Sequence, residues 1–138
     1  MSISQTLTTS FKQQLFQGVH DFSTDTFYMA LYTANADIGA ATTVYTATGE
    51  ISGTGYTATG QVMTGISVSV TGTTAFVNFS NVVWTPGAFT ARGALIYNLT
   101  QGSKSVAVLD FGADKTTTSS FTVVMPPNSS TTSLIRLP

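Results

Sequence analysis

The chain contains no cysteine and a single histidine, His20, among its 138 residues. The lack of cysteine excludes a disulfide framework, a CxxC redox centre and thiolate metal sites. One histidine is too few for a histidine-based metal cluster. No stretch approaches the roughly 18 consecutive apolar residues of a membrane-spanning helix. We therefore expect no metal, no cofactor and no membrane contact.

The first residues, MSISQTLTTSFKQQLF, lack the basic region and apolar run of a secretory signal. This predicts a soluble protein that is made in the cytoplasm and is not exported by the classical route.

Charged residues are also scarce, at 8% of the chain with a formal net charge of −1. An ordinary soluble domain carries roughly 25%. No basic stripe and no aromatic residues interleaved with Lys or Arg occur, which argues against nucleic acid as a partner. A weakly charged surface is poorly protected against association, and the cores of protein interfaces are depleted in charge. The composition thus predicts a protein that lies against other protein, with a threonine-rich monomeric β domain as the alternative.

Groups capable of catalysis are few. His20 follows an expected helix end, where a cation interacts well with the helix dipole, so a structural role is favoured. The carboxylates are Asp21, Asp25, Asp37, Glu50, Asp110 and Asp114. A glycosidase needs two carboxylates facing each other across a sugar, but most of these have turn or ion-pair roles available. There is no GxSxG motif. We predict no catalytic residue and no enzymatic activity.

What the chain does contain is strand pattern, centred on a hairpin from Trp84 to Phe111. Two apolar runs rich in strand-forming residues flank a polar loop, LTQGS, at 99–103. The register set by this symmetric loop pairs Ala91 with Phe111, Arg92 with Asp110, Gly93 with Leu109, Ala94 with Val108, Leu95 with Ala107 and Ile96 with Val106. Both faces are largely apolar, as in central strands packed on two sides. Arg92 and Asp110 are predicted to form a structural pair in this core.

The only helix expected is N-terminal, at about residues 10–18. Ser10 and Gln13 fit a capping box, Phe11 and Leu15 share one face, and Gly18 can end the helix.

Further strands are predicted on both sides of the central hairpin. TFYMALYT at 26–33 reads as a strand, and 66–79 reads as a hairpin with a Gly72-Thr73 turn that pairs Val68 with Val77 and Val70 with Ala75. Residues 112–120 read as a loop, and strands are expected at 121–125, stopped by Pro126-Pro127, and at 133–137.

Residues 34–65 are rich in Gly, Ala and Thr and lack strong periodicity. They are either short edge strands or an extended arm that reaches a partner. The whole pattern, with many short strands and no βαβ alternation, predicts one domain over residues 1–138. Its fold class is all-β, an antiparallel β-sandwich, jelly-roll or Ig-like, with one short N-terminal α-helix.

Several segments resemble a family of small structural proteins of tailed bacteriophages. They are FKQQLFQGVHDFSTDTFYMALYT, GEISGTGYTATG and, most specifically, FTARGALIYN followed by VAVLDFG. The resemblance covers nearly the whole chain and lies in scaffold residues. It implies a virion component without enzymatic activity, made in the host cytoplasm and located on the outer surface of the phage head. There it would act as a capsid decoration or cement protein, most plausibly a homotrimer, that bridges subunits of the major capsid protein.

Two alternatives stay open. Similar small β proteins serve in tails and at head-to-tail joints. A carbohydrate-binding β-sandwich for host attachment would use exposed Tyr45, Tyr56 or loop carboxylates. For a protein partner, the candidate interface residues are Phe11 and Phe16 on the helix and the same two tyrosines in the 34–65 segment.

Overall fold

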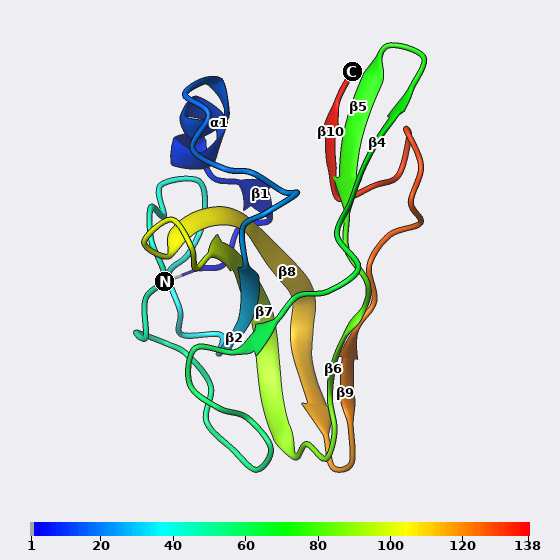
Figure 1. Ribbon diagram of the computed structural model, residues 1–138. Coiled ribbons are helices and arrows are strands. Elements are labelled where there is room, and N and C mark those ends of the chain that lie inside the picture. The colour runs from blue at the N-terminus through cyan, green and yellow to red at the C-terminus, as the bar shows by residue number, and fades with distance from the viewer. Residues whose placement is uncertain (1) are drawn as a thin grey trace.

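The structure is a computed structural model that describes residues 2–138, and it is an all-β sandwich with one short helix, as predicted. The strands form three sheets, all with antiparallel pairing, in the orders β1-β8-β7-β2-β3, β10-β5-β4 and β6-β9 (Figure 1). In chain order the elements are β1 (Thr6–Leu7), α1 (Thr9–Phe16), β2 (Phe27–Tyr32), β3 (Gln61–Val62), β4 (Ser67–Thr71), β5 (Thr74–Asn78), β6 (Val82–Trp84), β7 (Phe89–Asn98), β8 (Lys104–Thr117), β9 (Phe121–Val123) and β10 (Ile135–Leu137).

The hairpin of β7 and β8 lies at the centre of the five-stranded sheet, as predicted, and Asn98 pairs with Lys104 across the expected loop. The predicted register beyond the loop is wrong by one residue: Gly93 pairs with Asp110 and Leu95 with Val108. The cause is a β-bulge between the pairs of Ile96 and Tyr97, where β8 contains one extra residue. The loop alone therefore does not set the register of this hairpin.

The prediction of a loop at 112–120 is also wrong over most of its length. Strand β8 continues to Thr117, where its last residues pair with the start of β7, Phe89 with Thr117 and Ala91 with Lys115. A second register shift separates this pairing from the rest, and Gly112, with φ of +80°, lies within it. The run of threonines after Lys115 suits a pleated strand.

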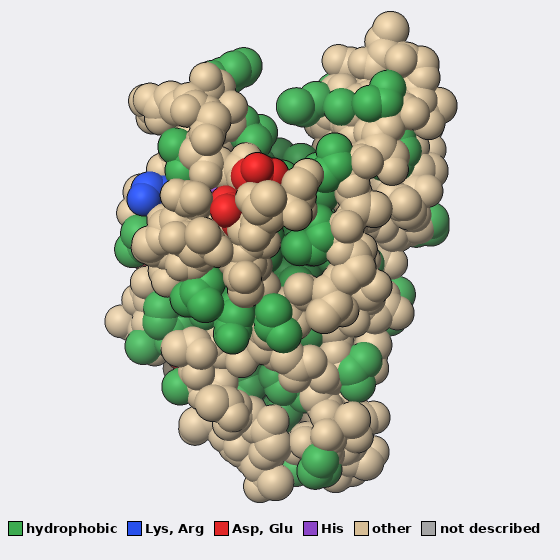
Figure 2. Space-filling model, viewed as in Figure 1, with side chains coloured by type: hydrophobic (Ala, Val, Ile, Leu, Met, Phe, Trp, Pro, Cys, Tyr) green, Lys and Arg blue, Asp and Glu red, His purple; other side chains and the backbone are tan. Residues whose placement is uncertain are grey.

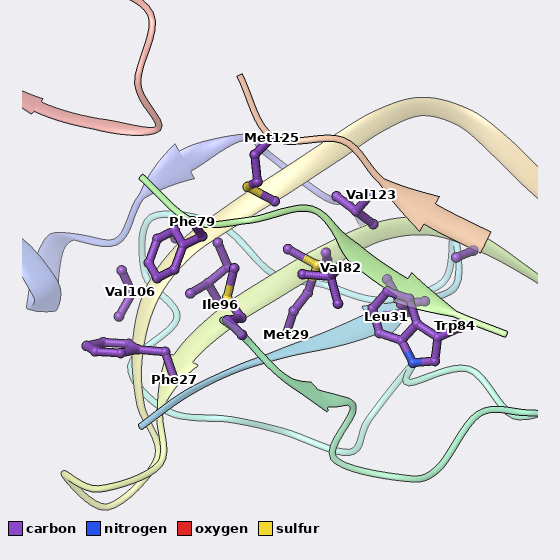
Figure 3. Close-up of a cluster of buried hydrophobic side chains, with 14 of the residues drawn as sticks. Phe27, Met29, Leu31, Phe79, Val82, Trp84, Ile96, Val106, Val123 and Met125 are labelled. Atoms are coloured by element: carbon purple, nitrogen blue, oxygen red, sulfur yellow. The ribbon is translucent and has the colours of Figure 1, made fainter. Parts of the chain in front are cut away.

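Both faces of the five-stranded sheet are covered, which confirms the prediction for the central strands. Because side chains alternate along a strand, Met29 and Ile96 point to one face while Ala30 and Leu95 point to the other. The first face packs against side chains from the β6–β9 side of the molecule: Phe79, Val82, Trp84, Val123 and Met125 (Figure 3). The second face packs against Ala36 and Ile38, from the segment whose pattern was weakest in the sequence.

Residues 34–65 are thus a cover for the sheet and not an extended arm. Glu50 bridges to Tyr32, the amide of Ile51 donates to the Leu31 carbonyl oxygen over 3.0 Å, and β3 pairs with β2. The segment follows the outer edge of β2 by single bridges and loops, so it never needs the two-residue period that a longer strand would show.

The N-cap of helix α1 lies two residues before the predicted one. Thr8, and not Ser10, is the N-cap: its hydroxyl accepts a hydrogen bond from the Phe11 amide over 3.3 Å. Thr8 is fully buried and its hydroxyl also accepts from Ser105 Oγ at 3.0 Å, so tertiary contacts select this cap. Gly18, with φ of +69°, ends the helix as predicted.

The predicted hairpin at 66–79 is confirmed, with Val68 paired to Val77 and Val70 to Ala75 across the Gly72-Thr73 turn. The late strands are also present as β9 and β10. Strand β10 joins the hairpin, and this three-stranded sheet projects from the body of the molecule at the same end as α1, across from the helix (Figure 1).

Candidate interaction surface

The two helix residues predicted at an interface have opposite environments. Phe11 is completely buried and packs against the His20 ring with centroids 4.9 Å apart, so its assignment to a partner contact is wrong. Phe16 is 95% exposed. Phe11 lies four residues from Leu15, on the face toward the core, whereas Phe16 points away from that face. Of these two, only Phe16 is available to a partner.

Tyr45 and Tyr56 are partly buried and are both held by one carboxylate. Both hydroxyls donate to Glu50, and the Thr59 amide donates to the same carboxylate over 2.8 Å. The Tyr45 ring lies 5.0 Å from that of Tyr97, and the Tyr56 ring packs among core aromatics. These tyrosines fasten the cover segment and present no open platform on which a sugar would stack.

The sheet contributes two more tyrosines to this cluster. The Tyr32 hydroxyl donates to the Thr46 carbonyl oxygen over 2.6 Å, and the Tyr97 hydroxyl donates to that of Thr59. Burial raises the pKa of Tyr97 to about 12 and that of Tyr32 further. Burial, followed by the hydrogen bonds to Glu50, likewise raises the pKa of Tyr45 and Tyr56. We call Glu50 with Tyr32, Tyr45, Tyr56 and Tyr97 the tyrosine cluster; its phenols are neutral donors.

His20 has both ring nitrogens engaged. The Asn98 amide nitrogen lies 3.0 Å from Nδ1, so Nδ1 accepts and Nε2 donates to Gln14 Oε1 at 2.8 Å. The same Asn98 amide donates to Asp25 over 2.8 Å. Burial lowers the pKa of His20, although the nearby Asp25 carboxylate opposes this effect. The network ties the end of α1 to the end of β7, which is the structural role expected for this histidine.

Arg92 and Asp110 form the expected ion pair, with Nε and Oδ1 3.5 Å apart. Their side chains are 35% and 30% exposed, so the pair lies at the surface of the sheet and its assignment to the core is wrong. It forms despite the shifted register because Asp110 pairs with Gly93, the neighbour of Arg92. A pair this exposed contributes about 0–1 kcal/mol to stability.

An apolar groove that was not predicted lies between β8 and the chain that follows β9. The groove has a volume of about 790 Å³. Its apolar lining includes Leu109, Phe111, Val124, Met125, Pro126 and Leu134, and we call this the apolar groove. Figure 2 shows hydrophobic atoms along the hollow between the α1 side of the molecule and the β4–β5–β10 side. The only signal in the sequence was Val124, an apolar residue at the position of the strand that alternation assigns to solvent.

Large hydrophobic side chains are exposed near this groove and elsewhere. Val124 is 73% exposed on the groove wall. Among residues 2–138, the exposed large hydrophobic residues are Phe16, Val44, Val62, Val68, Val70, Val83, Leu99, Val124 and Leu137. Exposed apolar surface of this kind, with few charges around it, is typical of protein-binding sites.

Within residues 2–138, no group of three or more His, Asp or Glu side chains is placed to hold a metal ion. In the same residues, no helix is long and apolar enough to cross a membrane. No protein-family model matches the chain, and neither the search of curated proteins nor that of solved structures found a match.

Proposed function

We propose that this chain is a structural protein of a tailed-phage virion, a capsid decoration or cement protein that binds and bridges subunits of the major capsid protein on the outer surface of the head. The apolar groove carries the proposal, because it gives a weakly charged molecule a concave apolar site with the exposed Val124 side chain on its wall. Phe16 is a second exposed apolar side chain, outside the groove lining. The phage context rests on the resemblance of the scaffold segments. The resemblance also implies a homotrimer.

Covering such a groove with a partner costs little desolvation free energy. Burying a charged group without a partner is costly, and the groove lining contains one charged residue, Lys115. Contacts in well-packed pockets from which water is fully excluded contribute most to interface energy. A protein that binds only the assembled shell stabilises that shell by mass action.

The same groove suits a tail or head-to-tail joint protein, and the location of the chain in purified particles separates these possibilities from the capsid. No observation favours the carbohydrate-binding alternative, since Tyr45 and Tyr56 are committed to Glu50. The engagement of His20 and Glu50 in internal hydrogen bonds supports a protein without catalytic activity.

The test is binding of the purified chain to phage heads that lack it, measured by co-sedimentation. We expect Val124→Lys to weaken binding at least about tenfold, about 1.4 kcal/mol, because it places a charge on the groove wall. Val62→Lys is the matched control: Val62 is 43% exposed on β3, at the opposite edge of the five-stranded sheet from β8.

Equal binding by wild type and the Val124 variant would remove the groove from the proposal. Absence of the chain from purified virions, as judged by mass spectrometry, would overturn the proposed function as a whole.

A further inference from the structure

Strand β4 is an open sheet edge. It is the last strand in the order β10-β5-β4, and its five residues, Ser67–Thr71, are uncharged and contain no proline. Val68 is 56% exposed and Val70 is 69% exposed. Within the described part of the chain, no side chain hydrogen-bonds to a β4 residue, and no backbone group outside its own sheet does so.

The other long edge of the fold is protected, which makes β4 unusual. Along β8, the Asp110 amide is satisfied by Gln5 Oε1 at 3.1 Å and the Gly112 amide by Asp110 Oδ1 at 2.9 Å. That stretch also carries Asp114 and Lys115. Charged residues and local hydrogen bonds of this kind discourage pairing with another strand. Strand β4 has neither protection.

The turn identifies which backbone groups of β4 point outward. In a hairpin with a two-residue loop, the residues that flank the loop, here Thr71 and Thr74, exchange backbone hydrogen bonds. Hydrogen-bonded and non-hydrogen-bonded pairs alternate along an antiparallel ladder. Ser67, Ser69 and Thr71 therefore bond to β5, and the N–H and C=O groups of Val68 and Val70 face away from the sheet.

We infer that two copies of this chain associate through β4 in an antiparallel pair about a two-fold axis at Ser69. In this register Val68 of each copy lies opposite Val70 of the other, and each such pair exchanges both backbone hydrogen bonds. The strand sequence SVSVT suits self-pairing because no like charges meet across the axis. The valine face continues across the sheet through Ala75 to Leu137, which is 55% exposed.

This contact goes beyond the proposed virion role, since it concerns two copies and not the capsid. A two-fold contact closes at two copies, whereas the resemblance implies three. The mass of the purified chain distinguishes them. At about 100 µM chain, analytical ultracentrifugation should give the mass of a dimer. A monomer or a trimer would overturn the inference.

Engineered cysteines test the register, because the chain has no cysteine of its own. Ser69 lies opposite Ser69 of the second copy in a non-hydrogen-bonded pair, with Cα atoms about 4.5 Å apart, within the range for a disulfide. Ser69→Cys should therefore form a disulfide-linked dimer under mild oxidation. Ser67→Cys is the matched control: its nearest copy lies about 14 Å away along the strand, which is too far. Equal cross-linking of both variants would contradict this register.

A charge on the edge provides an independent test. Val70→Lys should convert the dimer to monomer while the fold is retained, because the side chain is already exposed. Val124→Lys, on the apolar groove, should leave the dimer intact. Val124→Lys tests capsid binding and Val70→Lys tests dimerisation, so the two experiments can contradict one proposal without the other. A dimer that persists in Val70→Lys would overturn the β4 contact.

Discussion

Glu50 is the residue on which the cover segment depends most directly. Its carboxylate accepts hydrogen bonds from the Tyr45 hydroxyl, the Tyr56 hydroxyl and the Thr59 amide. Glu50→Ala leaves these donors without an acceptor. We expect the free energy of unfolding to fall by about 2–4 kcal/mol, because hydrogen bonds to a charged group are strong and unsatisfied donors are costly. Urea denaturation followed by fluorescence measures the change.

Asp37→Ala is the control, since Asp37 is an exposed carboxylate in the same segment. Its effect should stay within about 0.5 kcal/mol. Equal effects of the two substitutions would mean that the tyrosine cluster contributes little to stability.

For single residues, the sequence predicted the role of His20 correctly but did not predict which side chains are buried. His20 was predicted to be structural because it follows the end of the helix, and its hydrogen bonds to Gln14 and Asn98 agree with that role. Phe11 and Phe16 were both assigned to an interface, although Phe11 shares the face of Leu15 and Phe16 lies beside it, because only the packing of the helix shows which face the core covers. The partnership of Glu50 with two tyrosines depends on a loop path that has no sequence period.

At the scale of elements, Gly60 shows how closely the cover segment approaches β2. Its φ is +89°, and a Cβ atom there would overlap the Met29 carbonyl oxygen. Gly60→Ala combines left-handed backbone strain with this overlap. We expect Gly60→Ala to lower the free energy of unfolding by about 1–3 kcal/mol more than Gly72→Ala does. Chemical denaturation of both variants gives the difference.

Gly72 is a suitable comparison because it also has positive φ, +60°, but a Cβ atom there would meet nothing within 4 Å. The comparison therefore separates close packing from strain. Similar losses at the two positions would indicate that the segment yields locally and does not hold Gly60 against β2.

Elements with local signals were predictable and those set by packing were not. The β4–β5 hairpin follows from alternation and a Gly-Thr turn, and its pairs were correct. The bulge at Ile96 and the extension of β8 to Thr117 leave no mark in the hydrophobic pattern. The helix cap moved to Thr8 because Ser105, far along the chain, supplies its partner.

For the molecule as a whole, the tyrosine cluster predicts an alkaline limit of stability. Burial raises the pKa of Tyr32, Tyr45, Tyr56 and Tyr97 above the ordinary value of 10. Folding favours their neutral form, so the contribution of these tyrosines to stability is constant below about pH 10 and falls as the pH rises beyond it. Urea denaturation at about pH 8 and pH 10.5 should show this loss. Phenolate absorbance from these tyrosines in a protein that remains folded would contradict it.

Cover on both faces of the central sheet was predictable because both faces of the central hairpin carry apolar residues. The segment that covers one of these faces was not predictable, because residues 34–65 contact the sheet through isolated bridges. The apolar groove was also missed, because β8 and the chain after β9 line it together and neither shows it alone.

The pairing of β1 with β8 has a consequence for how the chain folds. Thr6 pairs with Val108, so most of the chain lies between the two partners. Closing so long a loop costs entropy before the contact stabilises anything, and folds dominated by such distant pairings form slowly, in about milliseconds to seconds. During synthesis the first strand and its helix must wait for β8 to emerge, so a nascent chain leaves its earliest apolar residues uncovered the longest.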